Sequence, residues 1–323
     1  MLKIAIGLVV IVASLLIAST IISGNAIRHR LEMISADART FVRDGQQIEY
    51  AVEGAGPPVL VIHGAGGGFD QGLLIGRELT GDGFQIIAVS RFGYLGSDLP
   101  DDASTPAQAD AFAALLEELS LSRVHVLAFS GGAPPALQFA ERYPDRLVSM
   151  AILSPAPFTP FGPDVEDRPI PSWVYSALFG NDAVYWVLSK LARASLLNAF
   201  DARAELRDNL SAREAAFVDA LVDTFLPASR RVRGVLNEGA AVDPATTYKL
   251  DAITAPVFVA HARDDRLNPV AVSLALSQGI DGSDVTLFDT GGHLLLGHHE
   301  ALRNRISWFY SAAASTGSES GGR

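Results

Sequence analysis

The sequence of 323 residues predicts an α/β fold in which a doubly wound, mostly parallel sheet carries helices on both faces. Three observations lead to this prediction. Short apolar runs rich in Val, Ile and Leu alternate with helical patterns along most of the chain. The runs are continuous instead of alternating with polar residues, which is typical of parallel strands buried on both faces. Between Ser154 and Pro256 no convincing strand is found, which predicts a helical cap inserted between two strands.

The predicted sheet begins with a hairpin. Phe41 and Val42 precede a turn at Asp44-Gly45, and a second strand follows from Ile48 to Val52, which is the Asp-Gly hairpin signal. Because strands and helices then alternate, we expect the later strands to be parallel and joined by right-handed crossovers. The later strands are predicted at Val59 to Ile62, Ile86 to Val89, Val124 to Phe129, Val148 to Leu153, Val257 to Ala260 and Val285 to Phe288. The helices are predicted at Ala107 to Leu119, Pro134 to Arg142, Val270 to Gln278 and Leu294 to Tyr310.

The helical cap is predicted at about residues 155–250, within an α/β domain that covers residues 40–312. Ser211, with Glu214 three residues later, forms a capping box that starts one of its helices. Ligands of open α/β sheets bind at the carboxyl ends of the strands, so this insertion is expected to cover the binding site. Its aromatic residues predict an apolar substrate; they are Phe158, Phe161, Trp173, Tyr175, Phe179, Tyr185 and Trp186.

The two ends of the chain differ in composition from this domain. Ile4 to Ser23 contains no charged residue, and a helix of that length spans about 30 Å, so residues 1–26 predict a single-pass membrane anchor. A signal peptide cleaved after Ala26, or a buried helix, are the alternatives. Positive charges flank the segment on both sides, so the sequence does not determine on which side of the membrane the α/β domain lies. Residues 27–39 predict a polar linker, and the Ser/Gly-rich residues 313–323 predict a disordered tail.

Composition excludes several classes of function. Hydrophobic residues make up 49% of the chain, which is enough for a sizeable core and excludes disorder over most of its length. The net charge of −11, without a Lys/Arg cluster, argues against nucleic acid as a partner. The absence of cysteine excludes disulfides, thiolate catalysis and Cys-ligated zinc. The oligomeric state stays open.

The residues around Ser130 match a nucleophile turn. The strand Val124 to Phe129 leads directly into Ser130-Gly131-Gly132, and a helix follows. A serine at such a strand-to-helix turn has a strained backbone and needs small residues two positions away, which Ala128 and Gly132 provide. The amides at the start of the helix point towards charge that forms next to Ser130. A structural Gly-rich turn without catalysis is the alternative.

A second glycine-rich segment follows the strand that ends at Ile62. Residues 63–68 read His-Gly-Ala-Gly-Gly-Gly, and this position suits a loop whose amides stabilise an oxyanion. The loop has neither the Lys-Ser/Thr of a Walker loop nor the G-x-G-x-x-G register of a dinucleotide site. We therefore expect the amides of Ala65 and Gly131 to form an oxyanion hole, and we expect no cofactor.

His293 is the preferred general base among the seven histidines. It lies in a loop directly after the last predicted strand, where an imidazole can reach the edge of the sheet that carries Ser130. A loop histidine exposed to water is the alternative. A metal site is not expected, because the spacing of the neighbouring side chains is not the i, i+4 pair that a helix uses; these are His293, His298, His299 and Glu300.

The acid of a Ser–acid–His order should follow a strand between the other two residues. Residues 261–269 follow the second-last strand and contain Asp264 and Asp265. We prefer Asp265, with Asp264 as the alternative; either carboxylate could instead be a solvated loop residue or a helix cap. In the order Ser130, Asp265, His293, each residue comes just past the carboxyl end of a strand, which is more specific than any one motif.

With these motifs, residues 40–312 resemble the α/β-hydrolase superfamily, and within it the cap-bearing branch of esterases, haloalkane dehalogenases, epoxide hydrolases and carbon–carbon bond hydrolases. Residues 91–97 resemble the family's R-x-G-x-G-S turn, which is interpreted as structural. Residues 261–265 resemble its H-G-x-x-D, with Ala262 in place of glycine, and this alignment puts the acid at Asp265. Dehalogenases and epoxide hydrolases of the family use an aspartate nucleophile, so Ser130 implies neither activity.

The sequence therefore predicts a carboxylesterase-like serine hydrolase that cleaves an ester-like bond of a small, apolar molecule through an acyl-enzyme intermediate. Hydrolysis of a carbon–carbon bond by the same three side chains is the first alternative. A binding protein on a hydrolase scaffold without catalysis is the second.

Overall fold

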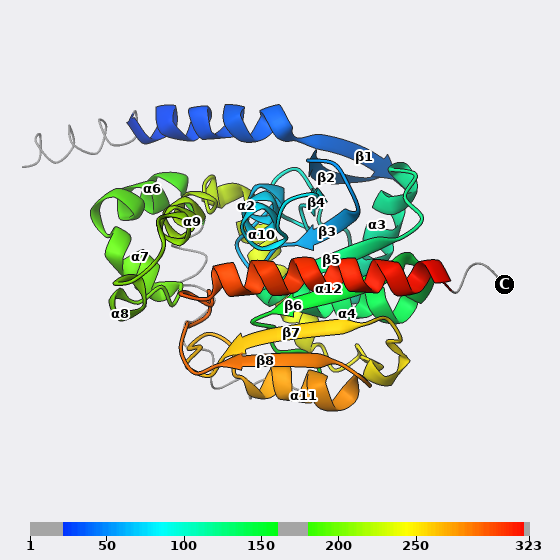
Figure 1. Cartoon of the computed structure of the whole chain (residues 1–323). Coiled ribbons are helices and arrows are strands. Elements are labelled where there is room, and N and C mark those ends of the chain that lie inside the picture. Colours follow the sequence, from blue (N-terminus) through cyan, green and yellow to red (C-terminus); the bar gives the residue numbers. More distant parts are fainter. Residues whose placement is uncertain (1–21, 161–179, 320–323) are drawn as a thin grey trace, which may run out of the picture.

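The computed structural model describes residues 22–160 and 180–319, and its centre is an eight-stranded sheet (Figure 1). The strand order is β1-β2-β4-β3-β5-β6-β7-β8. Strand β2 is antiparallel to both of its neighbours, and all other pairs are parallel. The strands are β1 Arg39–Arg43, β2 Gln46–Glu53, β3 Pro58–Ile62, β4 Gln85–Val89, β5 Val124–Phe129, β6 Leu147–Leu153, β7 Val257–Ala262 and β8 Asp284–Phe288.

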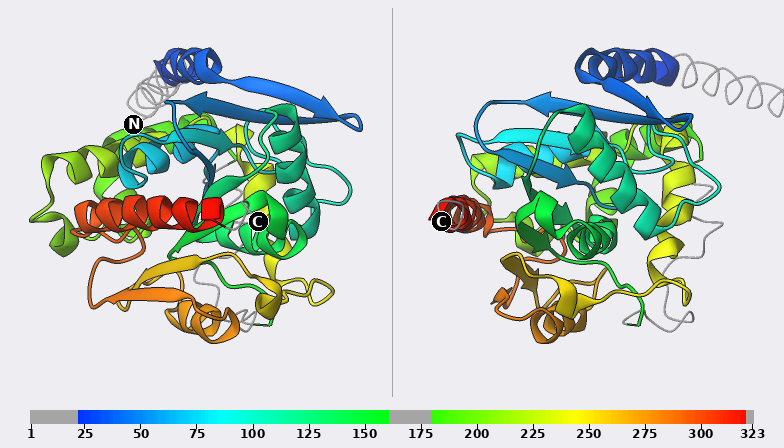
Figure 2. Two further views of the ribbon diagram at one scale, coloured as in Figure 1. Left: turned by 45° about the vertical axis from the view of Figure 1, so that its right-hand side comes forward. Right: turned by 90° about the vertical axis from the view of Figure 1, so that its right-hand side faces the viewer.

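Helices cover both faces of the sheet (Figure 2), which explains why the strand sequences are continuously apolar. One core lies between the sheet and helices α2 (Phe69–Leu79) and α12 (His299–Glu319). The other lies between the sheet and helices α3 (Thr105–Glu118), α4 (Ala133–Arg142) and α11 (Ala271–Gly279). Successive strand residues alternate between the two cores, and all six residues of β5 are buried.

All predicted strands are present, and the predicted helices differ mainly at their ends. Helix α2 was not predicted, because Gly72 and Gly76 lie within it and glycine disfavours helices. Both glycines face β4: a methyl group would lie 2.9 Å from the Ala88 side chain at Gly72, and 2.8 Å from that of Ile86 at Gly76. Close packing of α2 on the sheet thus explains why Gly72 and Gly76 occur in this helix, although glycine weakens the helical signal in the sequence.

The insertion forms a helical cap at the carboxyl ends of the parallel strands (Figure 1). Its described part, from residue 180 onwards, contains helices and no strand before β7, and the predicted capping box of Ser211 and Glu214 is present. Of the predicted aromatic residues, Phe158 and Tyr185 are fully buried, and those from Phe161 to Phe179 lie outside the described residues. The helices are α6 Asp182–Leu191, α7 Arg193–Ala199, α8 Ala204–Arg207, α9 Ala212–Asp223 and α10 Val232–Leu236.

The two ends of the chain differ from the predictions. Residues 22–37 form a helix where a linker was expected; Ile34 is buried, and Arg30 pairs with Asp70 of α2 at 2.5 Å. Helix α12 continues to Glu319 through most of the predicted disordered tail.

The membrane prediction requires a correction. Across residues 22–160 and 180–319, no helix combines the length and apolarity needed to cross a bilayer. Most of the predicted span from Ile4 to Ser23 lies outside the described residues. The finding contradicts the predicted anchor and single-pass membrane location, so both predictions are wrong.

Candidate active site

Ser130 lies at the end of β5 in the strained conformation that the nucleophile turn requires. Its φ is +51°, in the left-handed region that side chains other than glycine disfavour. Gly132 allows the close approach of β3, since a methyl group there would lie only 2.3 Å from the carbonyl oxygen of Ile62. The turn thus presents a mostly buried hydroxyl at the carboxyl edge of the sheet.

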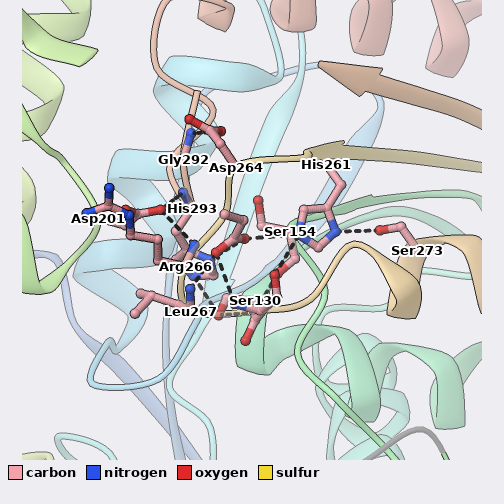
Figure 3. Close-up of polar contacts among 12 residues, drawn as sticks. Ser130, Ser154, Asp201, His261, Asp264, Arg266, Leu267, Ser273, Gly292 and His293 are labelled. Carbon is pink, nitrogen blue, oxygen red and sulfur yellow. Dashed lines mark hydrogen bonds and ion pairs between the residues drawn. The ribbon is translucent and has the colours of Figure 1, made fainter. Parts of the chain in front are cut away.

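The three side chains that the motifs singled out lie in one hydrogen-bonded series, and Figure 3 labels two of them, Ser130 and His293. Ser130 Oγ is 3.0 Å from His293 Nε2, and His293 Nδ1 is 2.9 Å from Asp265 Oδ2. Ser130 follows β5, Asp265 follows β7 and His293 follows β8, so the parallel sheet brings their loops to one edge.

Asp265 is held as a carboxylate. Burial alone would raise its pKa, but His293, hydrogen bonds from His261 and His293, and the amide of Asn268 together lower the pKa below its ordinary value. Oδ1 accepts the amides of Leu267 and Asn268 at 2.8 and 2.9 Å. An ionised Asp265 accepts the Nδ1 proton of His293, which leaves Nε2 able to accept the Ser130 proton.

The neighbouring Asp264 has different partners. Its Oδ2 pairs with the guanidinium of Arg203 at 2.5 Å, and its Oδ1 accepts the amide of Gly292 at 2.9 Å. Asp264 therefore ties the cap to the loop that carries His293, whereas Asp265 contacts the imidazole itself.

The loop of residues 63–68 lies next to the nucleophile turn. A methyl group at Gly131 would lie 3.2 Å from the Ala65 nitrogen, so these two residues face each other. Among the described residues, the Ala65 amide has no hydrogen-bond acceptor. A free amide at this position suits an oxyanion that forms at a carbonyl attacked by Ser130.

Buried polar contacts brace this loop. His63 Nε2 accepts the amide of Arg91 at 3.0 Å, and burial followed by the charge of Arg91 lowers the pKa of His63 well below its usual value, so its ring is neutral. Gly64 donates to Gln71 Oε1 at 3.1 Å, and the fully buried Arg231 donates to the carbonyl of Gly67 at 2.6 Å.

The sequence reasoning missed several residues of the site. His261 Nε2 lies 3.0 Å from Asp265 Oδ2, so two imidazoles share one carboxylate oxygen, and Ser273 Oγ lies 2.7 Å from the other nitrogen of His261. Asn268 Nδ2 lies 3.4 Å from Ser130 Oγ and donates to the carbonyl of Ser154 at 2.9 Å. The H-A-R-D-D motif contained the signal for His261, because its last residue, Asp265, follows β7 and turns back onto its first, His261, near the end of the strand.

Residues of the cap also reach the site, and no motif indicated them. Asp201 Oδ2 accepts the amide of His293 at 2.8 Å and the amide of Arg266 at 3.1 Å. Glu238, in the short helix Asn237–Val242, pairs with Arg91 beside the loop of residues 63–68. Within the described ranges, no cluster of His, Asp and Glu could hold a metal ion.

Comparisons with known proteins agree with this architecture. A family profile for the alpha/beta hydrolase fold matches residues 57–300. The 2-hydroxymuconate semialdehyde hydrolase of Pseudomonas sp. (strain CF600) is 28% identical, over 84% of this chain and 89% of its own length. The 2-hydroxy-6-oxononadienedioate/2-hydroxy-6-oxononatrienedioate hydrolase of Paraburkholderia xenovorans (strain LB400) is 26% identical, over 84% of this chain and 94% of its own length.

A solved alpha/beta hydrolase fold protein from Nakamurella multipartita is 27% identical, with a TM-score of 0.67, over 84% of this chain and 98% of its own. The family profile covers the strands from β3 onwards, the cap and the loops that carry Ser130, Asp265 and His293. The chain is a hydrolase by this similarity and belongs to the α/β-hydrolase fold family.

Proposed function

We propose that the chain is a serine hydrolase that cleaves an ester-like bond of a small, apolar substrate through an acyl-enzyme intermediate. The observation that carries the proposal is the series from Ser130 through His293 to Asp265, with distances of 3.0 and 2.9 Å. A histidine this close to a serine hydroxyl can take its proton as the oxygen attacks a carbonyl carbon.

In the first step, His293 Nε2 takes the Ser130 proton while Oγ bonds to the carbonyl carbon. The carbonyl oxygen becomes an oxyanion that the amides of Ala65 and Gly131 stabilise, and each such donor contributes about 10²–10³ in rate. Asp265 stabilises the protonated imidazole. The alcohol then leaves with the proton of His293, and a water molecule, activated by the same imidazole, releases the acid and restores Ser130.

Aromatic rings beside the oxyanion loop support an apolar substrate. A methyl group at Gly64 would lie 3.0 Å from the Phe129 ring, and one at Gly66 would lie 2.3 Å from the Phe225 ring. Phe225 stacks on Phe200 of the cap, with ring centroids 4.3 Å apart. The rings thus place apolar side chains next to the loop of the proposed oxyanion hole.

Hydrolysis of a carbon–carbon bond is the second candidate. It is favoured by the relatives at 26% and 28% identity, which are named as hydrolases of 2-hydroxy-6-oxononadienedioate and of 2-hydroxymuconate semialdehyde. The same three side chains could act in such a reaction, so the choice depends on the substrate and not on the nucleophile.

The test is labelling by a fluorophosphonate, together with turnover of 4-nitrophenyl esters. We expect the wild-type protein to be labelled and to hydrolyse medium-chain apolar esters, and Ser130→Ala to lose both properties because the nucleophile is removed. Ser122→Ala, which changes an exposed serine outside the site, serves as the matched control and should retain both.

A folded Ser130→Ala variant with unchanged esterase activity would refute the proposed nucleophile. Turnover of vinylogous diketones, with no turnover of any ester, would favour the carbon–carbon candidate. Absence of labelling and of all hydrolysis in the folded wild-type protein would favour a binding protein without catalysis.

A further inference from the structure

An ion pair between the cap and the sheet domain lies against the nucleophile turn. A methyl group at Gly131 would lie 2.6 Å from Glu238 Oε2 and 3.3 Å from the nearest nitrogen of Arg91. The space next to Gly131, where another residue would place its side chain, therefore holds a carboxylate and a guanidinium. The Ala65 nitrogen is 3.2 Å from the same point, so the pair adjoins the proposed oxyanion hole.

Arg91 is fixed in this place by the sheet domain. Its backbone amide donates to His63 Nε2 at 3.0 Å and its Nε donates to the His63 carbonyl at 3.1 Å. Its side chain is only 4% exposed. Burial opposes a charge, but the attraction and hydrogen bonds of Glu238 and Tyr94 together outweigh it and raise the pKa of Arg91, so the guanidinium is charged.

Glu238 neutralises this charge from the cap. Its carboxylate binds both terminal nitrogens of Arg91, and the Tyr94 hydroxyl donates to Oε1 while accepting the amide of Gly66 at 3.3 Å. Burial, followed by the charge of Glu238, raises the pKa of Tyr94 well above its usual value, so the hydroxyl keeps its proton. Glu238 is 22% exposed, so its free side is open to a neighbouring group.

The pair determines the charge that a substrate meets here. With Glu238 in place, Arg91 has a partner, and the oxygen that lies against Gly131, Oε2, belongs to a carboxylate. A carboxylate on the substrate close to the scissile carbonyl would be repelled by Glu238 and would find no free cation in Arg91. An uncharged group would meet neither penalty.

We propose that Glu238 is a specificity-determining residue that, by neutralising Arg91 beside the oxyanion hole, selects substrates without a carboxylate near the scissile carbonyl. This inference rests on the proposed ester hydrolysis and adds the charge class of its substrate. It also separates this chain from the two related hydrolases, one of which is named for a dicarboxylate and the other for a derivative of muconate.

The test compares ethyl butanoate with monoethyl succinate. The acyl chain of ethyl butanoate ends in a methyl group, and that of monoethyl succinate ends in a carboxylate. The rate of acid release measures hydrolysis of each ester. The wild-type protein should have a clearly higher kcat/KM for ethyl butanoate than for monoethyl succinate. Glu238→Gln keeps the shape and leaves Arg91 charged without an anion. It should shift the ratio of the two kcat/KM values towards monoethyl succinate by about tenfold or more.

Two variants show whether charge is the cause. Glu238→Asp keeps the anion and should keep the wild-type preference. Asp208→Asn removes one negative charge from an exposed position of the cap and should change the ratio by less than about twofold, because exposed charges at a distance are screened. If Glu238→Gln fails to fold, Glu238→Ala makes the same change of charge with less volume and must give the same shift.

An active Glu238→Gln variant with the wild-type ratio would overturn the inference, as would equal losses on both esters, which indicate a structural role only. This failure is distinct from failure of the proposed function, in which the wild-type protein hydrolyses neither ester and Ser130 is not labelled.

Discussion

The sheet domain and the cap contribute to the candidate site in different ways. Loops after three strands of the sheet supply Ser130, Asp265 and His293, which contact one another directly. The cap contacts the loops after β7 and β8, and also those after β3 and β4, through charged side chains, which are Asp201, Arg203, Arg231 and Glu238. The sheet thus provides the proposed reacting groups, and the cap holds their backbone and sets the charge beside them.

This difference shows why one region could be interpreted from motifs and the other could not. A parallel sheet brings the carboxyl ends of its strands together in every member of the fold, so short motifs after strands locate the site. The cap has no such rule, and its polar contacts depend on where each helix docks. Three predictions test this division, and they are ordered by expected effect.

The largest effect is expected from the two adjacent aspartates. Asp265→Asn should lower kcat by about 10³–10⁴, because the amide can no longer fix the tautomer of His293 or stabilise its charge. Asp264→Asn should lower kcat by less than about tenfold, since Asp264 binds Arg203 and the Gly292 amide instead. Steady-state kinetics on one ester, with thermal unfolding as a check, measure both. The reverse order of losses would move the proposed acid to Asp264.

An intermediate effect is expected at Asp201, which connects the cap to His293. Asp201→Asn removes a charge that accepts the amides of both His293 and Arg266 and that lies 3.1 Å from the Arg203 guanidinium. A small displacement of the base can cost two orders of magnitude, so we expect kcat to fall about tenfold to a hundredfold while KM changes less. Asp208→Asn is the matched control. A stable Asp201→Asn variant with wild-type kcat would show that the cap does not position the base.

The smallest effect concerns a histidine inside the sheet, far from the carboxyl edge. Burial, followed by the charge of Arg123, lowers the pKa of His125 from 6.5 to about 4. The unfolded chain therefore binds a proton below about pH 6.5 that the folded chain binds only near pH 4, so stability is lost as the pH falls through this window. His125→Gln should remove up to about 3 kcal/mol of that loss without affecting the kcat of ester hydrolysis.

Urea unfolding of wild type and His125→Gln at pH 7 and pH 5 provides the measurement. Parallel slopes of unfolding free energy against pH in the two proteins would contradict the lowered pKa. A changed kcat would show that the interior of β5 affects the proposed nucleophile at its end.

Most of the fold followed from local sequence pattern. The continuous apolar strands, the Asp-Gly hairpin and the capping box at Ser211 were all predicted, because each depends on residues close in the chain. Helix α2 was missed because its glycines are explained only by their packing on β4. The helix of residues 22–37 was missed because its polar sequence docks through Ile34 and through the pair of Arg30 with Asp70.

For the candidate site, the positions of Ser130, of the loop of residues 63–68 and of His293 follow from motifs that come directly after strands, because such motifs must lie at one edge of a parallel sheet. The family resemblance already favoured Asp265 over Asp264, but only the tertiary structure shows that Asp265 contacts His293, since the directions of the two adjacent carboxylates depend on Arg203 and on the loop after β8. The tertiary structure alone revealed that Glu238 reaches the space beside Gly131. That contact joins residues more than a hundred positions apart, and no local pattern encodes the docking of a cap helix on a distant turn.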